Sequence, residues 1–358
     1  MKKKVCFIIS GTMYSGAEIV LNRYLENNNC IEPFFVIIFN FKDVQEKFKK
    51  IYGDERVECL NINYNKNLIR YMMPFVIYNL NKKLGKSRFI KESDLIYVNN
   101  TTEGILCSKF ISNKDKRSIL HIHDMKECYT HPYNKYIINK YFKEYNEILT
   151  VSYATKKSWN PLNMKIIYNG LNEEYFQIKR KIDSIRKIGF VGSLNYRKGA
   201  DYLVDSLGKL LNYTELKFFF VFKEYDNKLL SKLKQYECDR VKILNNLNER
   251  EMVKFYDYID AIIVPSRLDP LPTVIMEAQA RGKLVVGNKK SGIPEMIPIK
   301  KFTKEINTSN DIVELIEEII DINQVELENI QKENFEYSKN KFNDALKKKE
   351  INKIIYRT

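Results

Sequence analysis

The chain has 358 residues, of which 44% are hydrophobic and 29% are charged, and its formal net charge is +15. This length exceeds one typical hydrophobic core and predicts two domains, whereas no apolar run approaches the roughly 18–20 residues that cross a membrane. The six cysteines are scattered over both halves without a CxxC pair, so neither a disulfide framework nor a zinc site is predicted, and a reducing cytoplasm is the expected compartment.

The first half of the chain alternates β-type runs with helical patterns, which is typical of a parallel sheet built from βα units. Its first apolar run, VCFII, follows three lysines but is shorter than the roughly 7–15 residues of a signal peptide, so it is interpreted as a strand. A helix is expected over 17–28. The expected strands cover residues 4–10, 34–40, 57–62, 94–100, 118–124, 147–153 and 165–169.

A charged passage, residues 173–186, separates this series from a second one and is interpreted as a linker. Right-handed crossovers in the second series predict another doubly wound sheet. Two amphipathic helices are expected near the end, over 311–320 and within 337–355. The expected strands of the second series cover residues 187–193, 216–222, 241–245, 261–265 and 284–288.

The most informative segment covers residues 264–297 and reads VPSRLDPLPTVIMEAQARGKLVVGNKKSGIPEMI. Two prolines stiffen the turn before a helix TVIMEAQA, and Pro272 is expected as the first helical residue, where its missing N–H would have no partner. The first N–H groups of this helix point toward the carboxyl ends of the strands, where the helix dipole favours an anion such as a diphosphate. Two carboxylates, Asp269 and Glu277, flank that place.

This segment resembles the donor-binding motif of the retaining glycosyltransferases of family four, in which a Glu, seven residues and a second Glu follow one another. Here Asp269 stands at the first position and Glu277 at the second. The resemblance implies the GT-B fold, an α/β architecture of two Rossmann-like doubly wound parallel-sheet domains that face a central cleft. The expected domains are an acceptor-side domain over 1–180, with a helix at about 340–358 packing back on it, and a domain over 181–339 that binds the nucleotide-sugar donor.

The sequence HIHD closes the fifth expected strand, and the side chains of His121 and His123 should point to the same face. All three histidines of the chain, counting His131, fall within eleven positions, so a metal site is one alternative, although no Cys or Glu stands at ligand spacing. The resemblance implies that His123 contacts the transferring sugar while His121 packs. Packing of both histidines is the other alternative.

In each series, the first strand is followed by a loop that contains glycine. The segment SGAE resembles a GGxE-like sequence of the family, which implies that Gly16 lies near the donor phosphate and the acceptor. In the second loop, Arg197 and Lys198 precede a helix, where two cations would neutralise a diphosphate. The family often has an Arg directly after the first Gly, where this chain has Ser193, so Arg197 could substitute for it. A surface charge pair is the alternative interpretation of Arg197 and Lys198.

The nucleotide base is expected to contact backbone groups near Asn246 and Leu247, as the resemblance implies. A helix follows, with Asn248 as its N-cap and Glu251 completing a capping box. The resemblance implies catalytic roles for His123, Asp269 and Lys198. It implies donor contacts from Gly16, Ser193, Arg197, Lys198, Asn246, Leu247, Asp269, Leu271, Thr273, Val274 and Glu277.

The resemblance further implies a metal-independent hexosyltransferase with no cofactor besides the nucleotide-diphosphate sugar, which is a co-substrate. The resemblance implies that retention proceeds by attack from the face of the leaving group. The sequence shows no paired nucleophile and acid of the glycosidase kind. The acceptor would be a hydroxyl of a glycan or a lipid-linked saccharide in the synthesis of a cell-surface polysaccharide or glycolipid. The alternative is an inactive glycosyltransferase-like subunit that binds or activates a partner, since Asp269 and Ser193 depart from the common pattern.

The positive charge is concentrated in the first half of the chain. Residues 1–182 contain 30 basic and 18 acidic residues, a net charge of +12, whereas residues 183–358 contain 30 and 27, a net charge of +3. Such a basic half could contact the anionic inner face of the cell membrane, as a peripheral protein of the cytoplasm would. Composition bias is the alternative, because 47 of the 60 basic residues are Lys. Nucleic acid is not an expected partner, since phosphate-reading sites lean on Arg.

Overall fold

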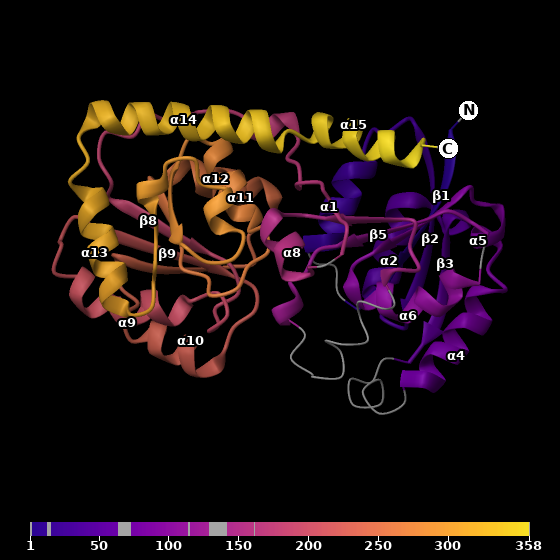
Figure 1. The fold of residues 1–358 in the computed structure, drawn as a ribbon. Coiled ribbons are helices and arrows are strands. Elements are labelled where there is room, and N and C mark those ends of the chain that lie inside the picture. The colour runs from indigo at the N-terminus through magenta and orange to yellow at the C-terminus, as the bar shows by residue number, and fades with distance from the viewer. Residues whose placement is uncertain are drawn as a thin grey trace. The chain divides into compact units, whose positions relative to one another are not determined.

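The computed structural model describes residues 2–12, 16–63, 73–113, 115–128, 142–160 and 162–357 (Figure 1). The chain forms two compact units, the first comprising Met1–Gly170 with Asp344–Thr358 and the second comprising Leu171–Asn343. Each unit contains one parallel sheet with helices on both faces. The predicted class, two Rossmann-like doubly wound parallel-sheet domains, is thereby confirmed.

The first unit has, in its described residues, a seven-stranded sheet in the order β3-β2-β1-β4-β5-β6-β7. Its strand order reverses between β1 and β4, which is the point where open sheets of this kind place polar loops at their carboxyl ends. All predicted strands of this series are present. They are β1 (Lys3–Ile9), β2 (Ile31–Phe39), β3 (Val57–Ile62), β4 (Leu95–Asn99), β5 (Ser118–Ile122), β6 (Glu147–Thr150) and β7 (Lys165–Ile166).

Two apolar cores cover the two faces of this sheet, because successive strand residues point to opposite sides. Val5, Phe7 and Ile9 of β1 belong to one core, and Cys6 and Ile8 belong to the other. The first core is covered by α1 (Gly16–Leu25), α2 (Lys42–Tyr52) and α15 (Asp344–Ile355). The second is covered by α4 (Met73–Leu84), α5 (Arg88–Glu92) and α6 (Thr101–Ser112), while α8 (Tyr153–Ser158) follows β6.

Helix α15 is anchored to the first unit by hydrogen bonds at its end. The guanidinium of Arg117 donates to the carbonyl oxygens of Ile354 at 2.7 Å, Ile355 at 3.1 Å and Arg357 at 2.6 Å. A cation at this position also interacts favourably with the helix dipole. The prediction placed the start of this helix at about residue 340. In the structure, the preceding helix continues to Phe342, and the C-terminal segment that belongs to the first unit begins at Asp344.

The second unit has, among its described residues, a six-stranded parallel sheet in the order β10-β9-β8-β11-β12-β13. The five predicted strands are present, and a short sixth strand, too brief to leave a pattern, adds to the edge beside β12. The strands are β8 (Lys187–Val191), β9 (Lys217–Phe222), β10 (Val241–Asn245), β11 (Ala261–Val264), β12 (Leu284–Asn288) and β13 (Thr303–Lys304).

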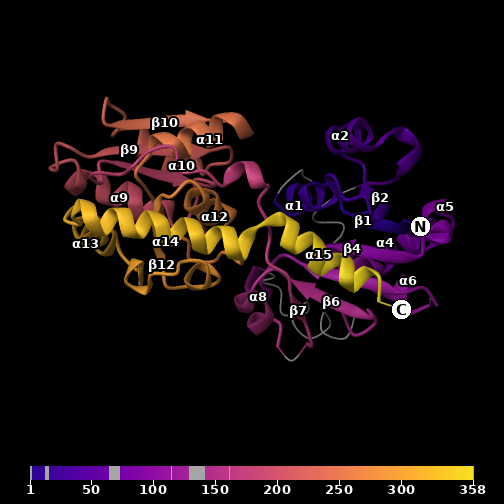
Figure 2. The same ribbon diagram turned by 90° about the horizontal axis from the view of Figure 1, so that it is seen from above.

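Helices cover both faces of this second sheet. One face carries α9 (Ala200–Leu210), α10 (Asn227–Lys234) and α13 (Ser309–Ile320), and the other carries α11 (Glu249–Tyr258), α12 (Thr273–Ala280) and α14 (Gln324–Phe342). Figures 1 and 2 show α14 running beside α12. The single helix expected within 337–355 is therefore two helices, divided at Asn343, whose backbone is extended. Short 3-10 helices lie at Asp54–Arg56, Lys126–Cys128, Glu173–Tyr175, Ile293–Glu295 and Lys300–Phe302.

The passage expected as a linker is packed against the second unit. Ile182 and Ile185 are buried, and the buried carboxylate of Asp260 accepts the backbone N–H groups of Arg186 at 2.9 Å and Lys187 at 2.7 Å. Because these residues already belong to the second unit, the first unit ends at Gly170, where the prediction had 180. Among the described residues, no helix has the length and apolarity needed to cross a membrane.

Replacing Arg117 with Leu should loosen the end of α15. The variant loses charge-assisted hydrogen bonds to three carbonyl groups, so we expect the free energy of unfolding to fall by about 1–3 kcal/mol. Urea unfolding measures this, with Lys109→Leu on the exposed side of α6 as the control. A change no larger than that of the control would show that Arg117 does not anchor the helix.

Candidate functional site

Three loops of the second unit interlock at the carboxyl ends of the neighbouring strands β8, β11 and β12. Gly199 has a positive φ of 68°, and a Cβ there would lie 2.1 Å from the carbonyl oxygen of Pro265. A Cβ on Gly292 would lie 1.8 Å from the carbonyl oxygen of Pro270. Only glycine permits such close backbone approaches, so these two positions fix the relative placement of the loops.

The predicted residues Lys198 and Asp269 meet in this loop cluster. The ammonium of Lys198 donates to the carboxylate of Asp269, which is only 4% exposed. Asn195 accepts the backbone N–H of Lys198 at 3.0 Å, and the carbonyl of Asp269 accepts the N–H of Gly292 at 2.9 Å. Both charged side chains are therefore held in place through their own backbones.

Helix α12 begins beside this ion pair. Pro272 is its N-cap, with ψ of 107°, so the prediction that Pro272 is the first helical residue is wrong by one position. The extended ψ keeps Pro272 outside the helix. Thr273 and Val274 therefore supply the first N–H groups of α12, which cannot find acceptors within the helix itself. Leu271 is buried before the turn. Glu277 lies one turn inside and accepts a hydrogen bond from the hydroxyl of Tyr256 at 2.9 Å.

The other predicted cation, Arg197, has a different setting. Its guanidinium donates to the carbonyl oxygen of Leu268 at 3.3 Å, while the hydroxyl of Ser193 donates to Glu224 at 3.1 Å. Arg197 thus contacts the loop after β11, and Ser193 contacts the carboxylate of Glu224. Sequence reasoning missed Arg267, which bridges the loops by donating to both carboxylate oxygens of Asp201 at 2.6 Å.

The predicted base-binding loop follows β10. Asn246 has a positive φ of 56°, and Leu247 is half-buried. The next helix, α11, begins with the predicted capping box of Asn248 and Glu251, which is confirmed. The loop geometry is thus set by an unusual backbone at Asn246 and by a capped helix directly after it.

In the first unit, His121 and His123 point to the same face of the sheet, as predicted, with ring centroids 4.3 Å apart. His121 is buried, and its Nδ1 lies 2.7 Å from the hydroxyl of Tyr97, which confirms that it packs. Nε2 of His123 lies 3.0 Å from Oδ1 of Asn99. Burial lowers the pKa of His123 to about 4 and lowers the pKa of His121 well below its ordinary value. Both imidazoles are therefore neutral near pH 7.

The loop after β1 is held by a buried carboxylate that sequence reasoning missed. Oε1 of Glu103, in the first turn of α6, accepts the backbone N–H of Ser10 at 2.7 Å. Burial raises the pKa of Glu103 to about 7. Gly16 begins α1 and has open space where a Cβ would be. Residues 13–15 of this loop and His131 lie outside the described residues. A run of polar residues at the end of β4, NNTTE, was the signal that could have indicated Asn99 and Glu103.

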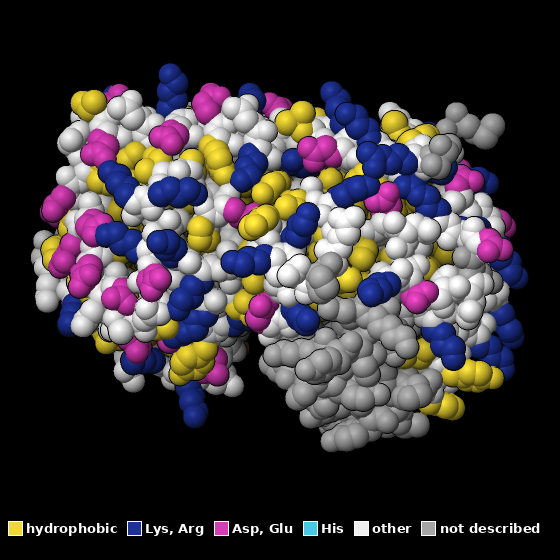
Figure 3. Space-filling view, viewed as in Figure 1, with side chains coloured by type: hydrophobic (Ala, Val, Ile, Leu, Met, Phe, Trp, Pro, Cys, Tyr) yellow, Lys and Arg dark blue, Asp and Glu magenta, His cyan; other side chains and the backbone are white. Residues whose placement is uncertain are grey.

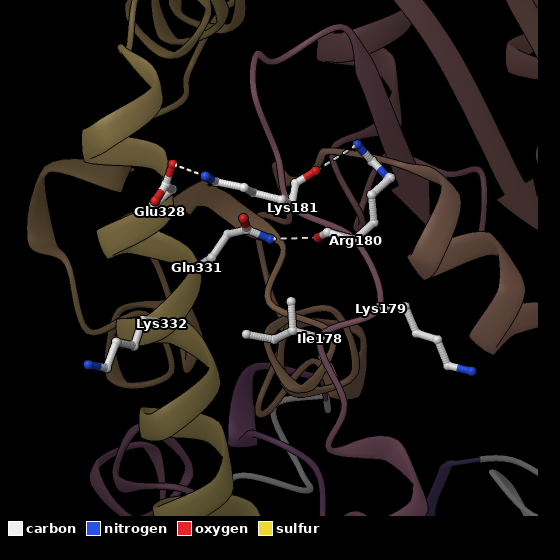
Figure 4. Close-up of a pocket in the computed structure, with 7 residues that line it drawn as sticks. All are labelled: Ile178, Lys179, Arg180, Lys181, Glu328, Gln331 and Lys332. Carbon is white, nitrogen blue, oxygen red and sulfur yellow. Dashed lines mark hydrogen bonds and ion pairs between the residues drawn. The ribbon is translucent and has the colours of Figure 1, made fainter.

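A hollow of about 260 Å³ lies on the second unit, away from these loops (Figure 4). It is lined by Ile178, Lys179, Arg180, Lys181, Glu328, Gln331 and Lys332. Its polar groups contact one another: Lys181 pairs with Glu328, and Gln331 donates to the carbonyl of Arg180 at 3.1 Å. Residues 178–181 precede β8, and Arg180 pairs with Asp260 directly before β11. The hollow therefore lies near the amino end of the sheet, opposite to the loop cluster. Within the described part of the chain, no group of three or more His, Cys, Asp or Glu could hold a metal ion.

The model of the family "Glycosyl transferases group 1" matches residues 172–338. Two curated relatives are uncharacterized glycosyltransferases of Methanocaldococcus jannaschii, MJ1607 with 29% identity over 174 residues and MJ1178 with 26% identity over 223 residues. These matches cover 42% and 58% of this chain, and they span 44% and 60%, about half, of the relatives' own lengths.

Among solved structures, Anabaena HepE (Alr3699), crystallised in complex with UDP and glucose, is similar over 99% of both chains, with 16% sequence identity and a TM-score of 0.78. This similarity concerns the fold, which is GT-B. The family model and the relatives thus show that residues 172–338, most of the second unit, are similar to the glycosyl transferases group 1.

Replacing Gly199 with Ala should disrupt the loop cluster. The added methyl group would collide with the carbonyl of Pro265 at a positive φ, so we expect the free energy of unfolding to fall by about 2–4 kcal/mol. Gly208→Ala, inside helix α9 with its nearest neighbour atom 3.5 Å away, is the matched control. It should be neutral or stabilise by up to about 1 kcal/mol. Equal effects in urea unfolding would contradict the proposed backbone contact.

Replacing Glu103 with Gln should change how stability depends on pH. The folded protein keeps the proton of Glu103 up to about pH 7, whereas the unfolded chain releases it near 4.5, so wild-type stability falls as pH rises through this window. We expect Glu103→Gln to gain up to about 3 kcal/mol relative to wild type between pH 5 and pH 8. Urea unfolding at both pH values, with the exposed Glu92→Gln as control, measures this. A pH-independent difference would mean that Glu103 is already ionised at pH 5.

Proposed function

We propose that the protein is a retaining, metal-independent glycosyltransferase that moves a sugar from a nucleotide-diphosphate sugar to a hydroxyl of a glycan or lipid-linked acceptor. The observation that carries this proposal is the ion pair of Lys198 and Asp269 beside the first turn of α12. A cation, a helix N-terminus and a carboxylate on the same helix form the set of groups that a sugar diphosphate requires. The similarity of residues 172–338 to the glycosyl transferases group 1 supports the activity.

The diphosphate of the donor would lie between Lys198 and the first turn of α12. The N–H groups of Leu271, Thr273 and Val274 are the candidate donors, and the helix dipole adds to their effect. Lys198 is held by Asp269, so it is ordered before the ligand arrives, which lowers the entropy lost on binding. As negative charge develops on the departing diphosphate, these same groups would stabilise it more strongly than in the ground state.

Glu277 would accept hydrogen bonds from the ribose hydroxyls. The hydroxyl of Tyr256 donates to one of its oxygens at 2.9 Å, which orients the carboxylate. Asn246 and Leu247 would contact the base through backbone groups, and Asp269 and His123 would position the sugar. Anabaena HepE supports a nucleotide-sugar donor, because its structures contain UDP and glucose or UDP-glucose.

Retention would follow from attack on the same face from which the diphosphate leaves, with the departing phosphate oxygen accepting the acceptor's proton. Asp269, the carboxylate at the centre of the loop cluster, is paired with Lys198, which argues against its acting as a nucleophile of the glycosidase kind. The positive charge that the reaction needs would come from Lys198 and α12, and Arg197 and Ser193 border the same loop. Such a site would require neither a metal ion nor a further cofactor.

The acceptor would be reached at the inner face of the cell membrane, in the synthesis of a cell-surface polysaccharide or glycolipid. Lys and Arg side chains gather over α15, whose sequence contains the run KKK, on the face seen in Figure 3. Together with the net charge of +12 over residues 1–182, this favours attraction to anionic lipid headgroups. The protein would then be cytoplasmic and peripheral to the membrane.

Donor binding tests this proposal. We expect one class among UDP-, GDP-, ADP- and CMP-sugars to raise the midpoint of thermal unfolding, because a ligand that binds only the folded state stabilises it. Lys198→Met and Glu277→Gln should each weaken that donor's affinity by roughly 10–100-fold, as the loss of a charge-assisted contact does. Lys181→Met is the matched control, since Lys181 also pairs with a carboxylate in the same unit but lies in the hollow at the opposite edge.

Transfer is then measured with the donor that binds. A donor that binds but is neither hydrolysed nor transferred would favour the inactive, partner-binding subunit. An affinity that depends equally on Lys181 and Lys198 would remove the assignment of the loop cluster as the donor site.

A further inference from the structure

A chain of hydrogen bonds joins two motifs of the first unit that are distant in sequence. Asn99, the final residue of β4, is 1% exposed. Its Nδ2 donates to the carbonyl oxygen of Ala17, at the start of α1, over 3.5 Å. Its Oδ1 lies 3.0 Å from Nε2 of His123. The SGAE segment and the HIHD segment are thus connected by one buried amide.

The carbonyl of Ala17 decides how this amide is oriented. A carbonyl oxygen can only accept, so the amide nitrogen must face Ala17, and the reversed amide would place two oxygens against each other. The amide oxygen of Asn99 therefore faces His123. Because this oxygen can only accept as well, Nε2 of His123 must carry a hydrogen.

A neutral imidazole carries only one hydrogen, so its Nδ1 is left with a lone pair. Burial lowers the pKa of His123 to about 4, which keeps the ring neutral near pH 7. Nδ1 has no hydrogen-bond partner among the residues that the structure describes, and His123 is only half-buried. A single acceptor atom is thus available to a ligand.

We propose that Asn99 is a positioning residue that holds His123 in its Nε2–H tautomer and so reserves Nδ1 as the acceptor for a hydroxyl of the bound sugar. The identity of the ligand rests on the proposed function, whereas the tautomer rests on the contacts of Asn99. A hydroxyl that donates to Nδ1 has its oxygen lone pairs directed away from the ring. The opposite tautomer would present an N–H group and select an acceptor in place of a donor.

The surroundings of Asn99 keep it in place. Asn100 has a positive φ of 104°, a backbone conformation that is strained for residues other than glycine. Asn100 lies between β4 and α6 as the N-cap of the helix. Its side chain accepts the N–H of Thr101 at 2.7 Å, and its own N–H donates to the carbonyl of His121 at 2.8 Å. Nδ1 of His121 contacts the hydroxyl of Tyr97, and among the described residues its Nε2 is buried without a hydrogen-bond partner.

Nitrogen NMR of the full chain labelled with ¹⁵N-histidine tests the tautomer directly. The chain has three histidines, and the variants His121→Gln and His131→Gln assign their signals. We expect His123 in wild type to show a protonated Nε2 and an unprotonated Nδ1. In Asn99→Leu this preference should be lost, and in Asn99→Asp the carboxylate should raise the pKa of His123 by about one unit or more. A protonated Nδ1 in wild type, or an unchanged spectrum in Asn99→Leu, would overturn the inference.

Turnover tests what the reserved atom does. With a donor that is transferred, we expect Asn99→Leu to lower kcat roughly 10-fold, about 1.4 kcal/mol, and to have no further effect in a His123→Ala background. Additive effects would overturn the role of Nδ1 because they would show that Asn99 acts independently of His123. The spectrum needs no donor, so a chain that binds none would refute the proposed function while the tautomer is still decided.

Discussion

The close backbone contact between Gly199 and Pro265 is the constraint on which the loop cluster of the second unit depends. It brings the loop after β8 against the loop after β11, and the ion pair of Lys198 and Asp269 forms at their junction. A carboxylate that is 4% exposed is stable as a charge only when it is paired and hydrogen-bonded. The loops place the pair, and the pair in turn holds the loops together, because losing one partner would leave the other charge buried and uncompensated.

In the first unit, the polar side chains at the carboxyl end of the sheet are held mainly by neutral groups. Where the second unit holds an ammonium with a carboxylate, the first holds an imidazole with an amide, and burial keeps the imidazole uncharged. The carboxylate of Glu103 restrains the nearby loop after β1 through the backbone of Ser10. Each unit therefore orders its polar groups at the carboxyl end of its sheet before a ligand is present, which is the arrangement that lowers the cost of binding.

The sequence predicts the fold well because buried parallel strands leave apolar runs that local patterns reveal, and all twelve expected strands are present. It predicts Asp269 and Glu277 because their spacing follows a known motif, and Lys198 because it stands after a strand and before a helix, where a cation can contact a diphosphate. It does not predict the contacts of Asn99, Glu103 or Arg267, since their partners lie 24 to 93 residues away. The polar run NNTTE could have indicated Asn99 and Glu103 as candidates, but it does not tell which groups they contact. The boundary after Gly170 was missed for a similar reason: Ile182 and Ile185 look exposed in a charged passage, but tertiary packing buries them.

The interrupted path of the chain has a consequence for its synthesis. Helix α15 contributes Ile351, Ile354 and Ile355 to a core whose other members come from residues 5–167. During translation the second unit, residues 171–343, is complete before these three side chains leave the ribosome. Until then, one apolar face of the nascent first unit lacks the side chains of α15. We expect a chaperone to be most useful during the synthesis of residues 171–343.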